Sequence, residues 1–593
     1  MENSYWSRYL QGRQLSRRRL LKGAAGVAVG GAALSLIGCG GGDDGGVKGD
    51  ASGLLSQAVE TTKDAKVGGA WASSYAEDIV NMDPILNNAS PTFPNLIPVY
   101  SQLLKSGLSA TKRPGSADIV GDLAQSWEFS GDGATMTLKL RPNMKWDPRP
   151  PTNGRVVTSA DVKAAWDKYA SVGNSRGELV RAANPDAPID SVETPDANTV
   201  VFKMGFPYPN VIDGLSNEQT FYVMPIDDSF NFRSDMRGTG PYRLESFRPS
   251  ASTTFVRNPD WYDAPRPYFE RLERTLISDY ATGLSQFKAG NIFDYSIMRP
   301  EDVLPTKRED PNLVLLPEKD IEFNAAFLNF SKADDSFFKD VRVRRALSMM
   351  LDRDLLTETF YNVSIFQEAG LPVKLYWHSH LAAGLPEWLD PQGTDLGEGA
   401  QYFQYNPAEA KKLVEAAGLT TPYAAPHHFF IDNAQEEVRY NEVINAMFND
   451  GGVFNLAIDG MQYDTSWRNA RASAGMGFKG VLWHRAAALS ADVILTQRYT
   501  PKGRNSVSAN PIPGITDLVL KQKTELDPKR REALIHDIQK AAALEFPDMT
   551  RAGTAPSFTL HQPWLSNHNV FSVGNDSAKP FVYAWYDESK RNS

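Results

Sequence analysis

Residues 121–140 read GDLAQSWEFSGDGATMTLKL, and the fold of the chain can be worked out from this stretch outward. Its last six residues, 135–140, alternate with a period of two, which predicts a half-buried antiparallel strand. Residues 198–204 show the same alternation. Between these strands, residues 158–161 (TSAD) form a capping box in front of apolar positions with helical spacing. The sequence therefore predicts a small α+β unit.

Strand and helix patterns alternate through the rest of the 593 residues, without a repeat of 20 to 50 residues, so the fold class is α/β. At about 150 residues per domain, this length predicts roughly three or four domains. Residues 67–75 are predicted to be the first strand. Helices are predicted to begin after Asp340, Asp352, Asn406 and Asp527, and the last of these helices should end near Pro547.

The N-terminus has the pattern of an export signal. Six basic residues and one acidic residue fall within residues 1–39, and residues 23–38 are uncharged and rich in Gly, Ala, Val and Leu. Residues 16–22 (SRRRLLK) resemble the twin-arginine motif, and residues 36–39 (LIGC) resemble a bacterial lipobox. Cys39 is the single cysteine of the chain, so we expect it to carry a lipid, and a disulfide or a cysteine zinc cluster is excluded.

The mature chain is expected to be acidic. Removing residues 1–39 takes away a net charge of +5 and changes the total from −9 to −14. Without a basic cluster, the chain is a poor candidate for binding nucleic acid. The glycine-rich residues that begin at Gly40 should form a flexible tether up to about residue 66, and the tether would hold a soluble body beside a membrane.

Six stretches, in order, resemble the family 5 extracellular solute-binding proteins, which are the oligopeptide, dipeptide and nickel receptors of ABC importers. In residues 257–262 the last two aromatic residues are exchanged relative to the family pattern. The stretches are GDLAQSWEFS at 121–130 followed by Asp132-Gly133, SADV at 159–162, GTGPY at 238–242, RNPDWY at 257–262, DVRVRRAL at 340–347 followed by Asp352-Arg353, and YNPAEAKKL at 405–413. We expect Gly238 and Gly240 to adopt positive φ and Pro241 to fix the turn.

This resemblance implies a two-lobed periplasmic binding protein fold of type II, similar to cluster C, with an α+β subdomain inserted in the first lobe. Two crossing strands would form the hinge, and residues 321–330 are the candidate for the outgoing one. The implied borders are residues 1–39 for the signal, 40–66 for the tether, 67–99, 221–317 and 547–593 for lobe one, 100–220 for the insert, and 318–546 for lobe two.

The implied function is that of a lipid-anchored, extracytoplasmic receptor, exported by the twin-arginine pathway, which closes on a solute and delivers it to ABC permease subunits. The receptor would be a monomer without cofactor, metal or catalytic activity. The alternative class is a secreted, membrane-tethered hydrolase. However, the sequence has no GxSxG, HExxH, EF-hand or GxxxxGK[ST] motif. Residues 336–339 (SFFK) match SxxK, a pattern that often arises by chance.

Metal binding is the less favoured interpretation of the two histidine pairs. His378 with His380, and His427 with His428, have no further ligand at a suitable spacing, so hydrogen-bonded or solvated histidines are expected.

Aromatic side chains usually line the clefts of this family, which makes Tyr75, Phe323, Phe327 and Trp483 the candidate ligand contacts. Trp377 and Trp467 are expected to be packing residues instead. Family members that take peptides hold the α-amino group with an aspartate about three residues after a Trp, and that position here is Ala486 or Ala487. A buried ammonium group without a carboxylate is costly.

His484 and Arg485 would suit an anionic or carboxylate-bearing ligand, although Arg485 could equally face solvent or an acidic neighbour. The missing aspartate argues against tight binding of a free peptide N-terminus, and a peptide remains the default expectation for the ligand because of the family resemblance. The alternatives within the family are a small anion, a metal complex or a sugar.

Overall fold

The computed structural model describes residues 50–79, 81–86, 93–110, 118–227, 229–232, 234–318, 325–432, 435–472, 475–486, 490–501, 503, 506, 512–573 and 576–591. These residues belong to the second of two compact units, Val47–Ser593. The predicted signal, Cys39 and the first part of the tether lie outside the described residues. None of the described helices combines the length and the apolar character that a bilayer crossing requires.

The stretch 121–140 forms part of an antiparallel four-stranded sheet with its own core, as predicted. The strand order is β5 (Ala124–Phe129), β6 (Thr135–Leu140), β8 (Thr199–Met204) and β7 (Ile189–Asp196). Helix α4 (Ser159–Val172) follows the predicted cap Thr158, whose amide donates to Asp161 Oδ2 at 3.0 Å. Trp166 and Tyr169 of α4 are buried against Phe202 and Phe221. Short elements complete the unit: α5 (Arg176–Leu179), α6 (Val211–Leu215), β2 (Leu104–Lys105) and β4 (Val120–Gly121).

A second four-stranded sheet contains the predicted first strand. Its order is β1 (Ala70–Tyr75), β11 (Arg271–Leu276), β10 (Ser252–Arg257) and β9 (Tyr242–Arg248). Strand β1 runs parallel to β11, and the other pairs are antiparallel. Elements that accompany this sheet in the chain are α3 (Phe93–Leu96), β3 (Leu108–Ser109), α7 (Tyr280–Lys288), α8 (Pro300–Glu309), β21 (Leu565–Ser566), β22 (Ser572–Val573) and β23 (Trp585–Tyr586).

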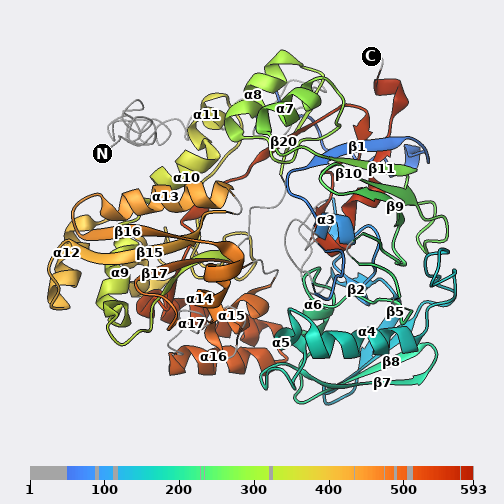
Figure 1. Cartoon of the computed structure of the whole chain (residues 1–593). Helices are drawn as coiled ribbons and strands as arrows, with labels where there is room; N and C mark the ends of the chain where they lie inside the picture. Colours follow the sequence, from blue (N-terminus) through green and yellow to red (C-terminus); the bar gives the residue numbers. More distant parts are fainter. Residues whose placement is uncertain are drawn as a thin grey trace, which may run out of the picture. The chain divides into compact units, whose positions relative to one another are not determined.

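The third sheet has five strands in the order β16 (Phe454–Met461), β15 (Tyr423–Phe430), β17 (Val481–Ala486), β13 (Ala325–Phe330) and β18 (Asp548–Thr550). Strand β15 is parallel to β16 and β17, whereas β13 is antiparallel to β17 and β18. Helix α13 packs on β15 and β16 (Figure 1). The helices of this part are α9 (Val341–Met349), α10 (Arg353–Tyr361), α11 (Val363–Glu368), α12 (Pro407–Ala416), α13 (Gln435–Asn449), α14 (Arg468–Ala472), α15 (Ala491–Tyr499), α16 (Pro513–Thr524) and α17 (Pro528–Glu545).

The four predicted helix starts are confirmed. The side chains of Asp340, Asp352, Asn406 and Asp527 each accept a hydrogen bond from a backbone amide in the first turn of α9, α10, α12 and α17. Helix α12 is followed by Gly418 at φ +82°, and α17 ends at Glu545, just before Pro547.

Two chain segments connect the last two sheets, and their described parts pair with each other near both ends. The outgoing segment leads from β12 (Val314–Pro317) to β13, and the returning segment leads from β18 to β20 (Phe558–His561). Strand β12 pairs with β20, and β13 pairs with β18, both in antiparallel fashion. Between these pairs, the amide of Glu318 donates to the carbonyl of Ser557 at 2.8 Å. Strand β14 (Tyr376–Trp377) also pairs with the returning segment, at β19 (Gly553–Thr554).

The prediction of positive φ at Gly238 and Gly240 is wrong, because neither residue has φ in the left-handed region. Their role is close backbone approach instead. A Cβ atom at Gly238 would lie 1.9 Å from the carbonyl oxygen of Val99, and one at Gly240 would lie 2.5 Å from that of Pro98. Only glycine fits here, since a side chain would push the two backbone segments apart.

Residues of the predicted tether that the structure describes pack on the body. Leu55 is buried beside Leu315, and the amide of Ser56 donates to the carbonyl of Leu315 at 2.8 Å. Thr61 donates to the side chain of Asn567 through its amide and its hydroxyl. These contacts fix the path of the chain into β1.

Candidate functional site

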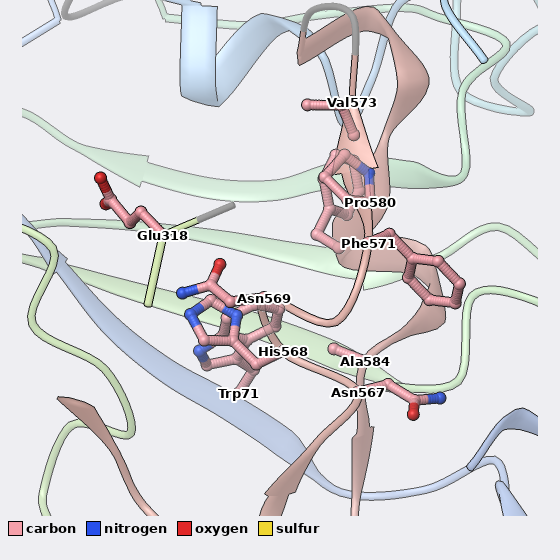
Figure 2. Close-up of a pocket in the computed structure, with 10 residues that line it drawn as sticks. Trp71, Glu318, Asn567, His568, Asn569, Phe571, Val573, Pro580 and Ala584 are labelled. Atoms are coloured by element: carbon pink, nitrogen blue, oxygen red, sulfur yellow. The ribbon is translucent and has the colours of Figure 1, made fainter. Parts of the chain in front are cut away.

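A cavity of about 270 Å³ lies between β1, the start of the outgoing segment, and the C-terminal part of the chain (Figure 2). Its walls are mostly apolar, with a small number of polar groups and a single carboxylate. The lining residues are Trp71, Glu318, Asn567, His568, Asn569, Phe571, Val573, Pro580, Phe581 and Ala584. Apolar walls with a small number of polar groups are the general composition of small-molecule pockets.

Trp71 forms a rigid wall of the cavity. Its indole Nε1 donates to Asp294 Oδ1 at 2.8 Å, and its ring packs on Phe269 with centroids 5.5 Å apart. The ring of His568 stands edge-on to Trp71 at 5.3 Å, and Figure 2 shows the two side chains next to each other. Because the indole is fixed by its neighbours, a ligand ring or aliphatic group would stack here without ordering a new side chain.

His568 is held between two asparagines that have left-handed backbone conformations, with φ of +60° at Asn567 and +54° at Asn569. Asn569 donates to Thr559 Oγ1 at 2.9 Å, and Asn567 donates to the carbonyl of Tyr583 at 3.1 Å. Burial lowers the pKa of His568 to about 4. The imidazole is therefore neutral near pH 7 and can both donate and accept a hydrogen bond.

Glu318 is the charged residue of the cavity lining, and it belongs to the outgoing segment. Its carboxylate accepts a hydrogen bond from the Ser557 hydroxyl of the returning segment. The same cavity thus contacts the connection between the sheet of β1, β9, β10 and β11 and the five-stranded sheet. Among the described residues that line it there is no serine, cysteine, threonine or lysine.

Tyr75, a predicted ligand contact, ends β1 and does not line this cavity. Its hydroxyl lies 3.4 Å from Thr253 Oγ1, and the guanidinium of Arg274 lies 5.6 Å from its ring centroid. Arg274 also donates to Asn95 Oδ1 at 2.8 Å. Burial lowers the pKa of Arg274 to about 10, so the guanidinium stays charged near pH 7.

Three other predicted residues lie together in the five-stranded sheet. Phe327 and His484 are register partners of β13 and β17, and their rings stack 5.0 Å apart. Trp483 is 1% exposed and donates to Glu437 Oε2 at 2.7 Å. All three are buried in this structure, and contact with a ligand stays a prediction. Phe323, Ala487 and the side chain of Arg485 lie outside the described residues.

Trp377 and Trp467, the two predicted packing residues, are buried as expected, and each belongs to an apolar cluster.

The four histidines of the two predicted pairs are buried too. His427 Nδ1 lies 3.0 Å from Asn445 Oδ1, and His428 Nε2 lies 2.7 Å from the carbonyl of Lys479. Within the described part of the chain, no group of three His, Cys, Asp or Glu side chains is arranged to hold a metal ion.

The SxxK match at residues 336–339 does not place a base beside the serine. Phe337, Phe338 and Lys339 form a 3₁₀ turn, and Lys339 Nζ lies 3.1 Å from Asp334 Oδ1. The lysine ammonium is therefore paired with a carboxylate at the surface.

Sequence reasoning missed Trp71 and His568 as cavity residues. The usable signal for His568 is the Asn-His-Asn sequence at 567–569, since asparagine tolerates left-handed backbone. Trp71 gives no such signal, because its position in β1 equally suits a core residue.

The chain matches the family model described as bacterial extracellular solute-binding proteins, family 5 Middle, over residues 118–505. The chain belongs to this family. A putative ABC transporter peptide-binding protein of Brucella ovis is 25% identical over 452 residues, which cover 72% of this chain and 78% of that protein. A probable D,D-dipeptide-binding periplasmic protein of Escherichia coli is 27% identical over 366 residues, 60% of this chain and 64% of that protein.

Solved structures show the same fold at low sequence identity. The periplasmic binding protein of Helicobacter pylori in complex with the peptide STSA has a TM-score of 0.70 and 17% identity, covering 89% of this chain and 99% of that one. The Brucella suis protein in complex with Fe(III)-EDTA has a TM-score of 0.67 and 19% identity, covering 88% and 100%. This family 5 protein therefore has the two-lobed α/β fold of type II, and it is a solute-binding protein of the class that serves ABC transporters.

Proposed function

We propose that this family 5 protein is a lipid-anchored receptor that closes two lobes on a peptide or related small molecule and presents it to the permease subunits of an ABC importer. The observation that carries this proposal is the pair of adjacent segments that connect the sheet of β1, β9, β10 and β11 with the five-stranded sheet. Two adjacent connections, running in opposite directions, would restrict the motion of the lobes to a hinge rotation.

The hinge divides the chain into the lobes that the resemblance implies. Lobe one would hold the sheet of β1, β9, β10 and β11, and lobe two would hold the five-stranded sheet. The four-stranded sheet of residues 100–220 would be the insert of lobe one. These borders support a receptor because a ligand that contacts both lobes stabilises the closed form only.

The cavity beside the hinge supports binding of a ligand with an apolar part and a polar or cationic end. Trp71 and Phe581 offer aromatic surface, His568 and Asn569 offer neutral hydrogen-bonding groups, and Glu318 offers a negative charge. Neither Ala486 nor Ala487 has a carboxylate to hold an amino group of the ligand. Glu318 could supply that carboxylate instead. Peptides are therefore the first ligand class to test, followed by small anions, metal complexes and sugars.

Lipidation of Cys39 and export through the twin-arginine pathway complete the proposal. They rest on residues 16–22 and 36–39 of the sequence. A lipid on Cys39 would keep the receptor at the extracytoplasmic surface of the membrane, within reach of its permease.

A thermal-shift screen of the purified chain tests the receptor function directly. A ligand present at about 100 times its Kd raises the free energy of unfolding by about 2.7 kcal/mol. We expect stabilisation by members of a library of di- to pentapeptides and no effect of nucleotides. Hydrolysis of a peptide or ester substrate, without stabilisation by any solute, would contradict the proposal.

A further inference from the structure

The predicted insert also contacts the predicted lobe two directly, through residues in loops and at helix ends away from the hinge segments. On the insert side are Asp186, before β7, and Tyr208 and Asn210, before α6. On the other side are Asp492 in the first turn of α15, Lys523 near the end of α16, and Arg531 in the first turn of α17. We call these six residues the latch.

Three hydrogen bonds join the two sides of the latch. The Tyr208 hydroxyl donates to Asp492 Oδ2, and the Arg531 guanidinium donates to Asn210 Oδ1. The ammonium group of Lys523 donates to the backbone carbonyl of Asp186 at 2.5 Å. Each bond has a charged donor or acceptor, the kind that contributes most to stability in a water-poor contact.

Aromatic rings of the insert cover the lysine. Lys523 Nζ lies 5.1 Å from the ring centroid of Tyr208 and 5.6 Å from that of Phe206. The side chain of Lys523 therefore combines a hydrogen bond with two cation–π contacts across the same boundary.

Four of the six latch residues are buried, whereas Asp186 and Arg531 are half-buried. Tyr208 is 7% exposed, and Asp492 and Lys523 are each 3% exposed. Burial lowers the pKa of Lys523, and the nearby Asp492 opposes this effect. On its own side, Asp492 accepts from Gln522 Nε2 and lies 3.5 Å from Thr496 Oγ1. If the two sides separated, the Asp492 carboxylate would keep these two partners and would exchange the Tyr208 hydroxyl for water.

We infer that the latch holds the two lobes closed without ligand, so that it regulates solute entry and sets part of the apparent affinity. The effect on solute affinity rests on the proposed function, whereas the contacts of the latch are observed in the structure. A contact that favours the closed form reduces the energy that the ligand must supply for closure. Weakening the latch should lower ligand affinity by the same factor by which it lowers the closed population.

Distance measurement between spin labels tests the latch in the absence of any ligand. The full chain with Cys39→Ala would carry the exposed substitutions Glu193→Cys in β7 and Lys540→Cys in α17. The parent should give a single short distance. Tyr208→Phe removes only the hydroxyl, and we expect it to lower the ratio of closed to open molecules at least about fivefold, with a second, longer distance.

Tyr169→Phe is the matched control, since the Tyr169 hydroxyl donates to the carbonyl of Ser175 inside the same predicted insert. It should leave the distances unchanged. Lys523→Met provides a second latch variant that retains the apolar stem, and it should also populate the longer distance. Unchanged distances in both latch variants would overturn the inference.

The peptide thermal-shift screen separates the two proposals. If peptides bind but the distances of the latch variants match those of the parent, the latch is wrong and the receptor function stands. If the variants open but no solute stabilises the protein, the latch stands and the receptor function fails.

Discussion

Asp122 and Lys579 form a buried ion pair, with Asp122 Oδ2 lying 2.9 Å from Lys579 Nζ across 457 positions of sequence. The carboxylate of Asp122 also accepts from the amide of Gln102 and the hydroxyl of Tyr262, each at 3.0 Å. Asp122 belongs to the stretch 121–140, so this family motif fastens the C-terminal part of the chain, which lines the cavity, to the predicted insert.

Removing one partner of this pair should be strongly destabilising. We expect Asp122→Asn to lower the free energy of unfolding by about 3 to 5 kcal/mol, because it leaves the Lys579 ammonium buried without its charge partner. Urea unfolding followed by circular dichroism measures the change. Lys163→Met is the control, since Lys163 and Asp167 pair on the exposed face of α4, and its effect should be below about 1 kcal/mol. Equal effects would contradict this interpretation.

Arg344, in the family stretch DVRVRRAL, should not tolerate lysine. Its guanidinium donates to the backbone carbonyls of Phe338, Lys339, Glu545 and Phe546, which joins the start of α9 to the end of α17. An ammonium cannot span these acceptors, so we expect Arg344→Lys to cost about 2 to 4 kcal/mol in urea unfolding. Arg530→Lys is the control, since the exposed Arg530 side chain pairs with Glu525 at the surface, and it should cost less than about 1 kcal/mol. A tolerated Arg344→Lys would show that the carbonyls find other donors.

His427 should make the protein sensitive to acid. Burial lowers its pKa to about 4, against about 6.5 in an unfolded chain, so between these values the unfolded state binds the extra proton. Stability is therefore lost as the pH falls from 6.5 toward 4, by up to about 1.4 kcal/mol per pH unit for this histidine. His427→Gln should reduce the slope of unfolding free energy against pH. An unchanged slope would mean that other groups cause the acid sensitivity.

Asp548 should add a second loss of stability at lower pH. Although burial opposes its charge, the adjacent Arg498 and His380 lower the pKa of Asp548 to about 2. The carboxylate stabilises the fold above the unfolded pKa of about 3.9, and this contribution disappears as the pH falls from about 4 to 2. Acid unfolding of Asp548→Asn, compared with that of the parent, should show a weaker pH dependence in this range. A parallel pair of curves would exclude Asp548 as the cause.

Trp71→Leu should weaken ligand binding by at least about tenfold, because it removes the aromatic wall of the cavity. The readout is the affinity for any peptide found in the thermal-shift screen, measured by calorimetry. Trp377→Leu is the control, as Trp377 packs in another cluster and donates to Asp354 Oδ1 at 2.8 Å. It should lower the melting temperature but not the affinity. If only Trp377→Leu weakened binding, the ligand would lie elsewhere.

Cys39→Ala should release the protein from the membrane fraction of cells, since the lipid has no other attachment point in this chain. Arg17→Lys combined with Arg18→Lys should prevent export. Immunoblots of membrane, soluble and extracytoplasmic fractions measure both effects. Retention of the Cys39→Ala variant in the membrane would disprove the anchor.

Local sequence signals predicted much of the fold. Residues 135–140 became a strand because alternation suits a half-buried sheet, and Asp340 began a helix because its carboxylate satisfies a free amide. Gly238 was misinterpreted because its constraint comes from Val99, which is distant in sequence. The cavity was missed for the same reason, since Trp71 and His568 meet only through tertiary packing.

The two paired connections have a consequence for how such receptors diversify. The polypeptide between residues 331 and 547 begins and finishes beside the same short stretch of backbone, as β13 and β18 are neighbours. Elsewhere it contacts the remaining chain through β14, which pairs with β19, and through the latch. A recombined segment that matched the two adjacent strand ends and these contacts would give the protein a different half-site and leave its predicted export and anchoring sequences unchanged.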